Sequence, residues 1–473
     1  MLEEDASDAV AALHDLSATD LIAGFRARQF SPLEVLDDVL AHVALWEPHI
    51  KALYAFDPEG ARLAANASTE RWQKGEPIGP LDGVPVTIKD NIATKGVAVP
   101  LGTAVTKLAP AEADAPPAAR LREAGSIIFS KTTMPDYGML SSGLSSFHPL
   151  TRNPWDLSKN PGGSSAGAAA ACAAGYGPLH LGTDIGGSVR LPACWCGLVA
   201  LKPSLGRVPI DPPYVGRVVG PMTRTVDDAA LMMSVMAKPD RRDGMSLPPN
   251  DIHWKTLDKP ARKLRIGLLL DLDVGQALEQ EVRDVAIKAA KAFEAAGAAV
   301  HEVKGILTRE MLDGLDNFWR ARAWDDLSRL VPTERGKTLP YILNWAEAGS
   351  KLSGVEVIRG FNATMAIRSA AAKLFADIDY LISPVSPVVK FAAELAAPLN
   401  DPGRPFEHIG YTVPWNMAEN PAISINGGYD AAGFPIGVQI IGRRFDDLGV
   451  LGMAKAFEGL REPQRPWPKP PVR

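Results

Sequence analysis

The chain has 473 residues, of which 46% are hydrophobic and 22% charged, and its formal net charge is −5. This mixture is that of an ordinary globular protein, so it excludes the disordered, collagen-like and coiled-coil classes. An acidic balance with no dense run of Lys and Arg also argues against nucleic acid and anionic membranes as partners. Chemistry on small molecules is therefore the expected kind of function.

The amino-terminal stretch MLEEDASDAV is acidic and lacks the basic start and apolar run of a secretory signal. No run of about 18 strongly apolar residues follows it, so we predict a cytoplasmic protein without a membrane span. The three cysteines, Cys172, Cys194 and Cys196, are too few for a disulfide framework. Because no histidine lies at zinc-ligand spacing from the C-x-C pair, we predict structural cysteines and no metal.

Two helices are predicted near the start of the chain. Apolar residues recur at helical spacing over residues 16–46. Within this stretch Ser31, Pro32 and Glu34 combine an N-cap, a first-turn proline and a capping-box glutamate. Short β-rich runs then follow at 84–88, ending at Lys89, and at 126–130.

The remaining chain alternates between strand and helix patterns. Small residues in AAAACAAGY predict a helix that packs closely behind a site, and HLGTD predicts the strand that follows it. Later buried strands are predicted in KLRIGLLLD, AAVHEV, DYLISPV, NPAISIN and FPIGVQIIG, with a helix over 277–296. This alternation predicts an α/β fold with a sheet covered by helices on both faces. Residues 239–262 are interpreted as a surface excursion and 463–473 as a Pro-rich tail, so a single domain over 1–473 is expected.

Two glycine-rich stretches, PGGSSAG and GTDIGGSVR, contain the candidate nucleophiles. Ser165 formally matches the G-x-S-x-G nucleophile elbow, but no β-run leads into it. That elbow also needs a downstream histidine, and none of those available stands in a distinctive context: His180, His253, His301 and His408.

Ser188 has the better setting, because it ends a turn between a predicted strand and a predicted short helix. Unpaired N–H groups of such a turn can converge on one point, as they do in an oxyanion hole. The adjacent Gly186 and Gly187 leave these amides open to a substrate carbonyl. A glycine-rich phosphate-binding turn is the alternative, although the lysine-serine ending of a P-loop is missing.

A serine hydroxyl needs a base before it becomes a nucleophile at neutral pH. Lys89 ends an apolar strand, where desolvation would lower its pKa and leave a neutral amine able to take a proton. A surface lysine is the alternative for this residue taken alone, so the assignment depends on the whole set of residues.

That set resembles the amidase signature family. The resemblance is carried by GVPVTIKDNI, RNPWDLSKNPGGSSAGAAAACAAG, GTDIGGSVRLPACWCGLVALKPSLGRVP and GPMTRTVDDAALM, and by NPAISINGG and GFPIGVQIIGR nearer the end. It extends from about residue 17 to residue 460. The family's Gly-Gly-Ser-Ser-Gly-Gly motif stands here with Ala166 in its fifth position, which leaves both serines in place.

The resemblance implies the family's large mixed sheet and its Ser-cisSer-Lys triad. It assigns the nucleophile to Ser188, the bridging serine to Ser164, with a cis peptide at Gly163–Ser164, and the base to Lys89. It also implies that the oxyanion hole is formed by the backbone amides of Ile185, Gly186, Gly187 and Ser188. The residues implied to support this loop are Ser165, Asp184 and Arg190.

The implied activity is hydrolysis of a small-molecule amide through an acyl-enzyme, without cofactor or metal, and esters and carbamates could react at the same site. A urethane- or urea-type hydrolase and the glutaminase subunit of a tRNA-dependent amidotransferase stay open, as does a homodimer. Residues 1–60 are expected to form N-terminal helices and 305–395 a helical cap over the site. Aromatic and apolar residues proposed for the substrate pocket are Tyr137, Met139, Trp195, Phe318, Trp319 and Trp415.

Overall fold

An 11-stranded mixed β-sheet runs through the protein, in the order β1-β3-β2-β4-β6-β5-β10-β11-β9-β7-β8. The structure is a computed structural model that describes residues 12–471. The strands are β1 Leu53–Tyr54, β2 Pro85–Lys89, β3 Ile127–Thr132, β4 Leu179–Asp184, β5 Val199–Lys202, β6 Val218–Thr223, β7 Arg265–Leu268, β8 Ala299–Glu302, β9 Tyr380–Pro384, β10 Ala422–Tyr429 and β11 Pro435–Gly442.

Parallel pairing occurs in two separate parts of the sheet. Strands β3, β2 and β4 are parallel neighbours, and so are β8, β7 and β9. The strands between these groups pair antiparallel with their neighbours. The predicted α/β fold with a large mixed sheet is confirmed.

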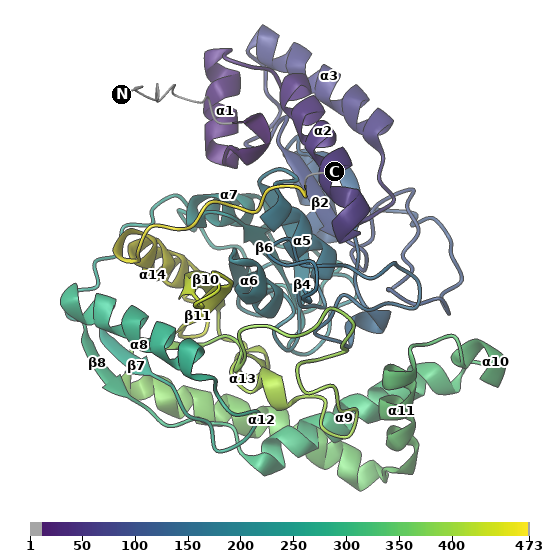
Figure 1. Cartoon of the computed structure of the whole chain (residues 1–473), viewed down its shortest axis with the longest axis vertical. Helices are drawn as coiled ribbons and strands as arrows, with labels where there is room; N and C mark the ends of the chain where they lie inside the picture. Colours follow the sequence, from purple (N-terminus) through teal and green to yellow (C-terminus); the bar gives the residue numbers. More distant parts are fainter. Residues whose placement is uncertain (1–11, 472–473) are drawn as a thin grey trace, which may run out of the picture.

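Helices cover both faces of this sheet (Figure 1). On one face α5 packs against β2, β3 and β4, and its neighbour α6 packs against β5, β10 and β11. A second set, in which α14 contacts both α7 and α8, packs against β4, β5, β6, β8, β9, β10 and β11. The α-helices are α1 Ala18–Ala27, α2 Pro32–Ile50, α3 Pro58–Lys74, α4 Pro116–Glu123, α5 Ala166–Ala174, α6 Arg190–Cys196, α7 Val226–Met236, α8 Gln280–Ala295, α9 Arg309–Ser328, α10 Pro332–Arg335, α11 Pro340–Glu347, α12 Gly354–Asp377, α13 Val413–Met417 and α14 Asp447–Leu460.

The two predicted N-terminal helices are α1 and α2, and the capping box of α2 is formed. Ser31 accepts a hydrogen bond from the Glu34 N–H, and the Glu34 carboxylate accepts one from the Ser31 N–H. With Pro32 at its first position, the start of α2 has the local features that its sequence predicts.

Three short sequence interpretations need correction or refinement. The stretch AAVHEV forms β8 as predicted, but β8 is the last strand of the sheet and its residues are mostly exposed rather than buried. Residues 239–262 contain no regular element, yet Trp254 and Leu257 within them are buried in the core. In the Pro-rich tail, the Trp467 ring lies 4.3 Å from the Arg224 guanidinium carbon, so the tail is packed on the body.

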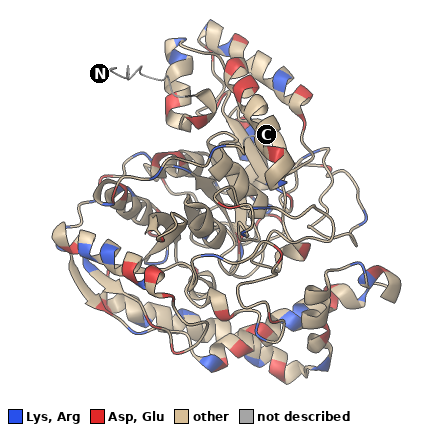
Figure 2. Ribbon diagram, viewed as in Figure 1, with Lys and Arg blue, Asp and Glu red and all other residues tan. Residues whose placement is uncertain are grey.

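Helices α9 to α12 form a group at one end of the molecule, below the sheet in Figure 1. Basic and acidic side chains occur together on these helices and on α3 and α8, whereas the central layer is mostly uncharged (Figure 2). Within residues 12–471, no helix is both long and apolar enough to cross a membrane.

Candidate active site

The amine of Lys89 is the centre of a buried cluster of hydroxyl groups. Lys89 is the last residue of β2, which lies between β3 and β4, and the side chain is fully buried. Its Nζ lies 2.8 Å from the Ser164 Oγ and 2.9 Å from both the Ser165 Oγ and the Thr183 Oγ1. The lysine predicted as base therefore contacts the predicted bridging serine directly.

Burial lowers the pKa of Lys89 well below its usual value, and the positive charge of Arg217 lowers it further. The carboxylates of Asp184 and Asp90 act in the opposite sense but do not reverse the shift. A neutral amine has two N–H groups and one lone pair. It can therefore donate to two of the three hydroxyls around it and accept the proton of the third.

Two other buried lysines can be compared with Lys89. Burial lowers the pKa of Lys131 and of Lys202 to about 7 in each case. Lys131 donates to the Ile92 carbonyl and Lys202 to the Pro203 carbonyl. Burial alone is thus common to all three, and the contact with serine hydroxyls distinguishes Lys89.

Ser164 and Ser165 are held at the start of α5 by close backbone packing. The Gly163–Ser164 peptide bond is cis, as the resemblance implied. A Cβ on Gly167 would lie 2.2 Å from the Ala52 carbonyl oxygen and 2.4 Å from the Thr133 N. The small residues of this helix are needed because the backbone behind the site approaches so closely.

The turn that carries Ser188 follows β4 and precedes α6. Gly187 has φ +133°, and a Cβ at this position would lie 2.6 Å from the Thr412 Oγ1. The Thr412 hydroxyl donates to the Gly186 carbonyl oxygen at 2.6 Å, which fixes the orientation of that peptide. Gly187 is therefore required by the shape of the turn.

Asp184 and Arg190 form a buried ion pair under this turn, with an N–O distance of 3.0 Å. The Asp184 carboxylate also accepts hydrogen bonds from the Gly187 and Val189 N–H groups, at 2.8 and 3.1 Å. Burial by itself would raise the pKa of Asp184, but the charge and hydrogen bonds of Arg190 hold it well below its usual value. Both residues therefore support the turn from beneath, as the resemblance implied.

One of the four amides predicted for the oxyanion hole, that of Gly187, is already used within the protein. The Gly187 N–H is donated to Asp184, so it is not available to a substrate. In the described part of the chain, the N–H groups of Ile185, Gly186 and Ser188 have no hydrogen-bond partner. These three amides can receive a developing oxyanion.

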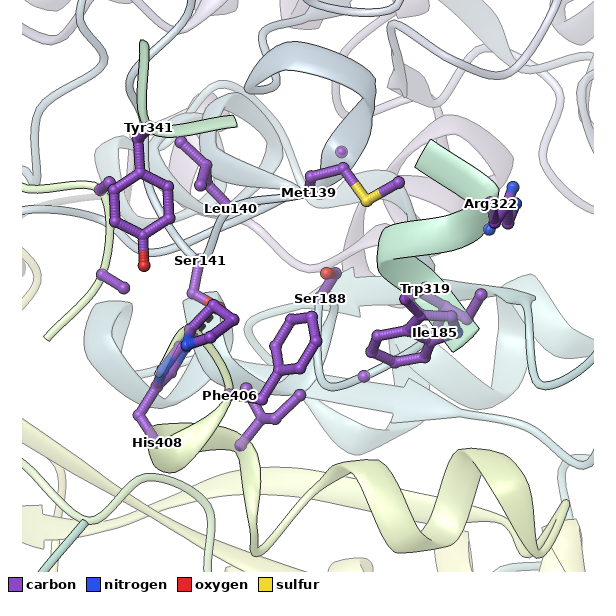
Figure 3. Close-up of a pocket in the computed structure, with 16 residues that line it drawn as sticks. Met139, Leu140, Ser141, Ile185, Ser188, Trp319, Arg322, Tyr341, Phe406 and His408 are labelled. Atoms are coloured by element: carbon purple, nitrogen blue, oxygen red, sulfur yellow. Dashed lines mark hydrogen bonds between the residues drawn. The ribbon is translucent and has the colours of Figure 1, made fainter. Parts of the chain in front are cut away.

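Ser188 is half-buried and faces a cavity (Figure 3). Its carbonyl oxygen accepts a hydrogen bond from the Ser165 N–H at 3.2 Å. Among residues 12–471, no hydrogen bond joins the Ser164 and Ser188 hydroxyls. Hydrogen bonds of this kind commonly tighten only when substrate is bound.

Two of the six residues proposed for the substrate pocket line this cavity, namely Met139 and Trp319. Ile409 and Phe406 add to its apolar wall, and the Trp319 and Phe406 rings meet edge to face with centroids 5.0 Å apart. The cavity surface next to Ser188 is therefore largely aromatic and aliphatic.

The other four proposed residues lie outside the cavity lining. Trp195 and Trp415 are fully buried core residues, and their rings pack against Phe391 and Phe375. Phe318 contacts Phe361 of α12, with ring centroids 5.5 Å apart. Tyr137 is half-buried beside the cavity wall. These positions correct the pocket that was expected from the sequence.

Several cavity residues gave no sequence signal. Helices α9 and α11 of the segment 305–395 contribute Arg322 and Tyr341, while His408 comes from the short 3-10 helix Glu407–Ile409 before α13. The His408 Nε2 is 2.8 Å from the Ser141 Oγ, and burial lowers the pKa of His408 to about 3. These residues reach the cavity only through long-range packing, which local patterns do not encode.

The histidines downstream of Ser165 do not pair with a candidate nucleophile in the described chain. His180 is buried, with its nitrogens 2.7 Å from the Thr87 Oγ1 and 3.0 Å from the Gly177 carbonyl oxygen. Within residues 12–471, no group of three or more His, Cys, Asp or Glu side chains is arranged to hold a metal ion.

The fold and site define an α/β protein in which a buried lysine contacts a serine beside a glycine-rich turn, and the turn presents a second serine to a cavity. The family described as Amidase matches residues 34–451. The chain is 34% identical over 468 residues to an acylamidase of Rhodococcus erythropolis, covering 96% of each chain. It is 33% identical over 493 residues to a subunit of the glutamyl-tRNA(Gln) amidotransferase of Chloroflexus aurantiacus, covering 96% of this chain and 99% of the relative.

A solved bacterial aryl acylamidase of the amidase signature enzymes superposes with a TM-score of 0.87 at 29% identity, covering 95% of this chain and 96% of that one. The chain belongs to the amidase signature family, and it is an amide-hydrolysing enzyme.

Proposed function

We propose that the enzyme cleaves the carboxylic amide bond of a small molecule, with Ser188 as nucleophile, Ser164 as proton relay and Lys89 as base. The observation that carries this proposal is the buried Lys89 amine 2.8 Å from the Ser164 Oγ, next to the turn that carries Ser188. Among the buried lysines of the described chain, Lys131 contacts the Thr94 hydroxyl, but only Lys89 contacts serine hydroxyls.

In the first half-reaction the Ser188 Oγ forms a bond to the amide carbon. Its proton passes to Ser164 while the Ser164 proton passes to the neutral Lys89 amine. The developing oxyanion accepts hydrogen bonds from the free amides of Ile185, Gly186 and Ser188. The proton then returns through Ser164 to the leaving nitrogen, the C–N bond breaks and the amine departs.

In the second half-reaction, water attacks the Ser188 ester and gives one proton to the same relay. That proton returns to the Ser188 Oγ as the ester bond breaks and the acid leaves. Amides depend most on the returned proton because their nitrogen is a poor leaving group. Esters and carbamates can use the same route, so a urethane- or urea-type hydrolase is one form of the same proposal.

The glutaminase subunit of a tRNA-dependent amidotransferase is the second candidate. The relatives that belong to such an amidotransferase match at 33% identity over nearly their whole length, about as well as the acylamidase does. Such a subunit would copurify with partner subunits and release ammonia from glutamine only in their presence. The isolated chain hydrolysing an anilide would favour the acylamidase-like function.

The test is a hydrolysis screen of the isolated chain over primary amides, anilides, esters, carbamates and glutamine, with Ser188→Ala as the control. We expect turnover of at least one amide, labelling of one site by a neutral fluorophosphonate, and loss of both in Ser188→Ala. Undiminished labelling of the folded alanine variant would remove Ser188 as the nucleophile.

A further inference from the structure

A guanidinium group stands at one end of the cavity without a carboxylate partner in the described chain. Arg322 of α9 lines the cavity, and Figure 3 shows it at the opposite end from Tyr341 and His408, with Ser188 between them. The side chain is half-buried. Its position gives the cavity one cationic end and one neutral end.

The other arginines of α9 show what is unusual about Arg322. Arg309 pairs with Asp313 and Glu407, and Arg320 pairs with Asp316. Within residues 12–471, no carboxylate lies within 4.0 Å of the Arg322 guanidinium, although Asp326 is one turn further along the helix. Its guanidinium carbon instead lies 3.7 Å from the centre of the Tyr214 ring. The ring holds the group in place but leaves its charge available.

A second arginine, Arg217, is close enough for its charge to act on Arg322, although it is not part of the cavity lining. Arg217 directly precedes β6, and the pairing of β6 with β4 sets Val218 opposite Asp184, at the start of the turn that carries Ser188. In the described chain Arg217 has no carboxylate within 4.0 Å, and its guanidinium donates only to the Pro212 carbonyl, at 3.4 Å. The carboxylate of Asp211 acts on Arg217 only from beyond 4.0 Å, and Asp211 is exposed to solvent.

The two charges act on each other and on the lysine. Burial lowers the pKa of Arg217 to about 10, and the positive charge of Arg322 contributes to that shift. The two guanidinium groups repel each other and are partly removed from water, which raises their electrostatic free energy. A bound anion would lower it.

We propose that the substrate carries a carboxylate, bound by Arg322 at the cationic end of the cavity and further attracted by the charge of Arg217, while its amide carbon lies at Ser188. This inference rests on the proposed function and names the class of substrate for that site. The geometry favours a carboxylate because a guanidinium offers two parallel N–H donors that match its two oxygens. The aromatic wall of Trp319 and Phe406 would cover the apolar remainder of such a molecule.

Two pairs of anilides test the proposal. Each pair consists of a carboxylate and a neutral analogue of similar size and shape. The carboxylate is on the amine side in 4-acetamidobenzoate, with 4-methylacetanilide as its neutral partner. It is on the acyl side in succinanilate, with butyranilide as its neutral partner. We expect kcat/KM to be about 10- to 100-fold higher for one carboxylate than for its partner, as charge-assisted hydrogen bonds would provide. The pair that shows the effect identifies the side.

Arg322→Met should remove this preference mainly by raising KM for the carboxylate, and Arg322→Lys should restore part of it. The matched control is Arg329→Met, at the end of the same helix, where the side chain is 69% exposed and paired with Asp325. Labelling of Ser188 by a neutral fluorophosphonate should proceed at the parent rate in Arg329→Met, and in the two Arg322 variants it reports that Ser188 is still reactive. The same four anilides are also tested as protectants against this labelling, so that binding is measured even where turnover is slow.

Each outcome decides between the two claims. Normal labelling with equal turnover and equal protection by charged and neutral anilides would overturn the carboxylate inference and leave the proposed function intact. A carboxylate preference that survives in Arg322→Met would also overturn it. Absence of both labelling and turnover would overturn the proposed function, and the inference with it.

Discussion

The buried ion pair beneath the glycine turn gives a prediction whose size follows from the structure. In Arg190→Met the Asp184 carboxylate keeps its three backbone N–H donors and the Asn416 amide, but it loses its only partner of opposite charge at contact distance in the described chain. Breaking a fully buried pair in this way costs about 3–5 kcal/mol. Methionine fills most of the volume, so little of this cost comes from a cavity.

Arg190 also donates to three oxygens that would lose their donor. The Gln439 Oε1 and the Asn416 Oδ1 are each 2.6 Å from a guanidinium nitrogen, and the Thr412 carbonyl oxygen is 3.0 Å away. Each unsatisfied acceptor adds about 1 kcal/mol or more. We therefore expect Arg190→Met to lose at least about 4 kcal/mol of unfolding free energy, a large part of the about 5–15 kcal/mol typical of folded proteins.

The assay is urea unfolding followed by tryptophan fluorescence, for the parent, Arg190→Met, and the double variant Asp184→Asn/Arg190→Met. Removing the charge of Asp184 as well should recover part of the loss, since no unpaired ion then stays buried. Arg265→Met, which breaks an ion pair with Asp379 at the surface, is the control and should leave the urea midpoint unchanged.

The pH dependence has a definite sign. The pKa of Asp184 is lower in the folded protein than in the unfolded chain, where it is about 3.9. The stability from the pair is thus complete above about pH 5 and is lost as the pH falls toward the folded-state pKa. The difference between parent and Arg190→Met should narrow over that acidic range. An Arg190→Met protein within about 1 kcal/mol of the parent at pH 7 would refute the role given to the pair.

Three further predictions concern the reaction. Lys89→Arg should abolish amide turnover because arginine cannot become neutral. In the parent enzyme, kcat/KM should fall as the pH drops through the lowered pKa of Lys89. An arginine variant with normal turnover and an unchanged pH profile would remove Lys89 from the mechanism. Gly187→Ala should slow acylation about 10²- to 10³-fold, because the added Cβ would meet the Thr412 Oγ1 and displace the neighbouring amides. If stopped-flow kinetics showed that the variant is acylated at the parent rate, this prediction would be wrong. Dialysis against a chelator should leave the rate unchanged, and activity restored by one added metal would count against the metal-free mechanism.

The local parts of the structure could be predicted because short-range physics determines them. The capping box of α2 and the apolar strand β2 are determined by residues that are neighbours in the sequence, and Lys89 is the last residue of that strand. The cis peptide at Gly163–Ser164 came from the resemblance rather than from any local pattern.

The cavity could not be predicted in the same way. Trp195 and Trp415 stand near motif residues in the sequence, but large apolar rings gain most from full burial and both lie in the core. Arg322 and His408 are ordinary in their own sequence contexts and reach the cavity through α9 and the short 3-10 helix before α13. Their roles depend on how distant segments pack, which periodicity and composition do not specify.

The partners of Arg190 have a consequence for protein synthesis. Three of its acceptors belong to Thr412, Asn416 and Gln439, which are made more than 220 residues after Arg190 itself. β5, the strand after α6, likewise pairs with β10, from the last part of the chain. A growing polypeptide on the ribosome thus contains Lys89, Ser164 and Ser188 long before it contains the residues that shape their turn. We therefore expect the turn that carries Ser188 to reach its final shape only when translation is nearly finished.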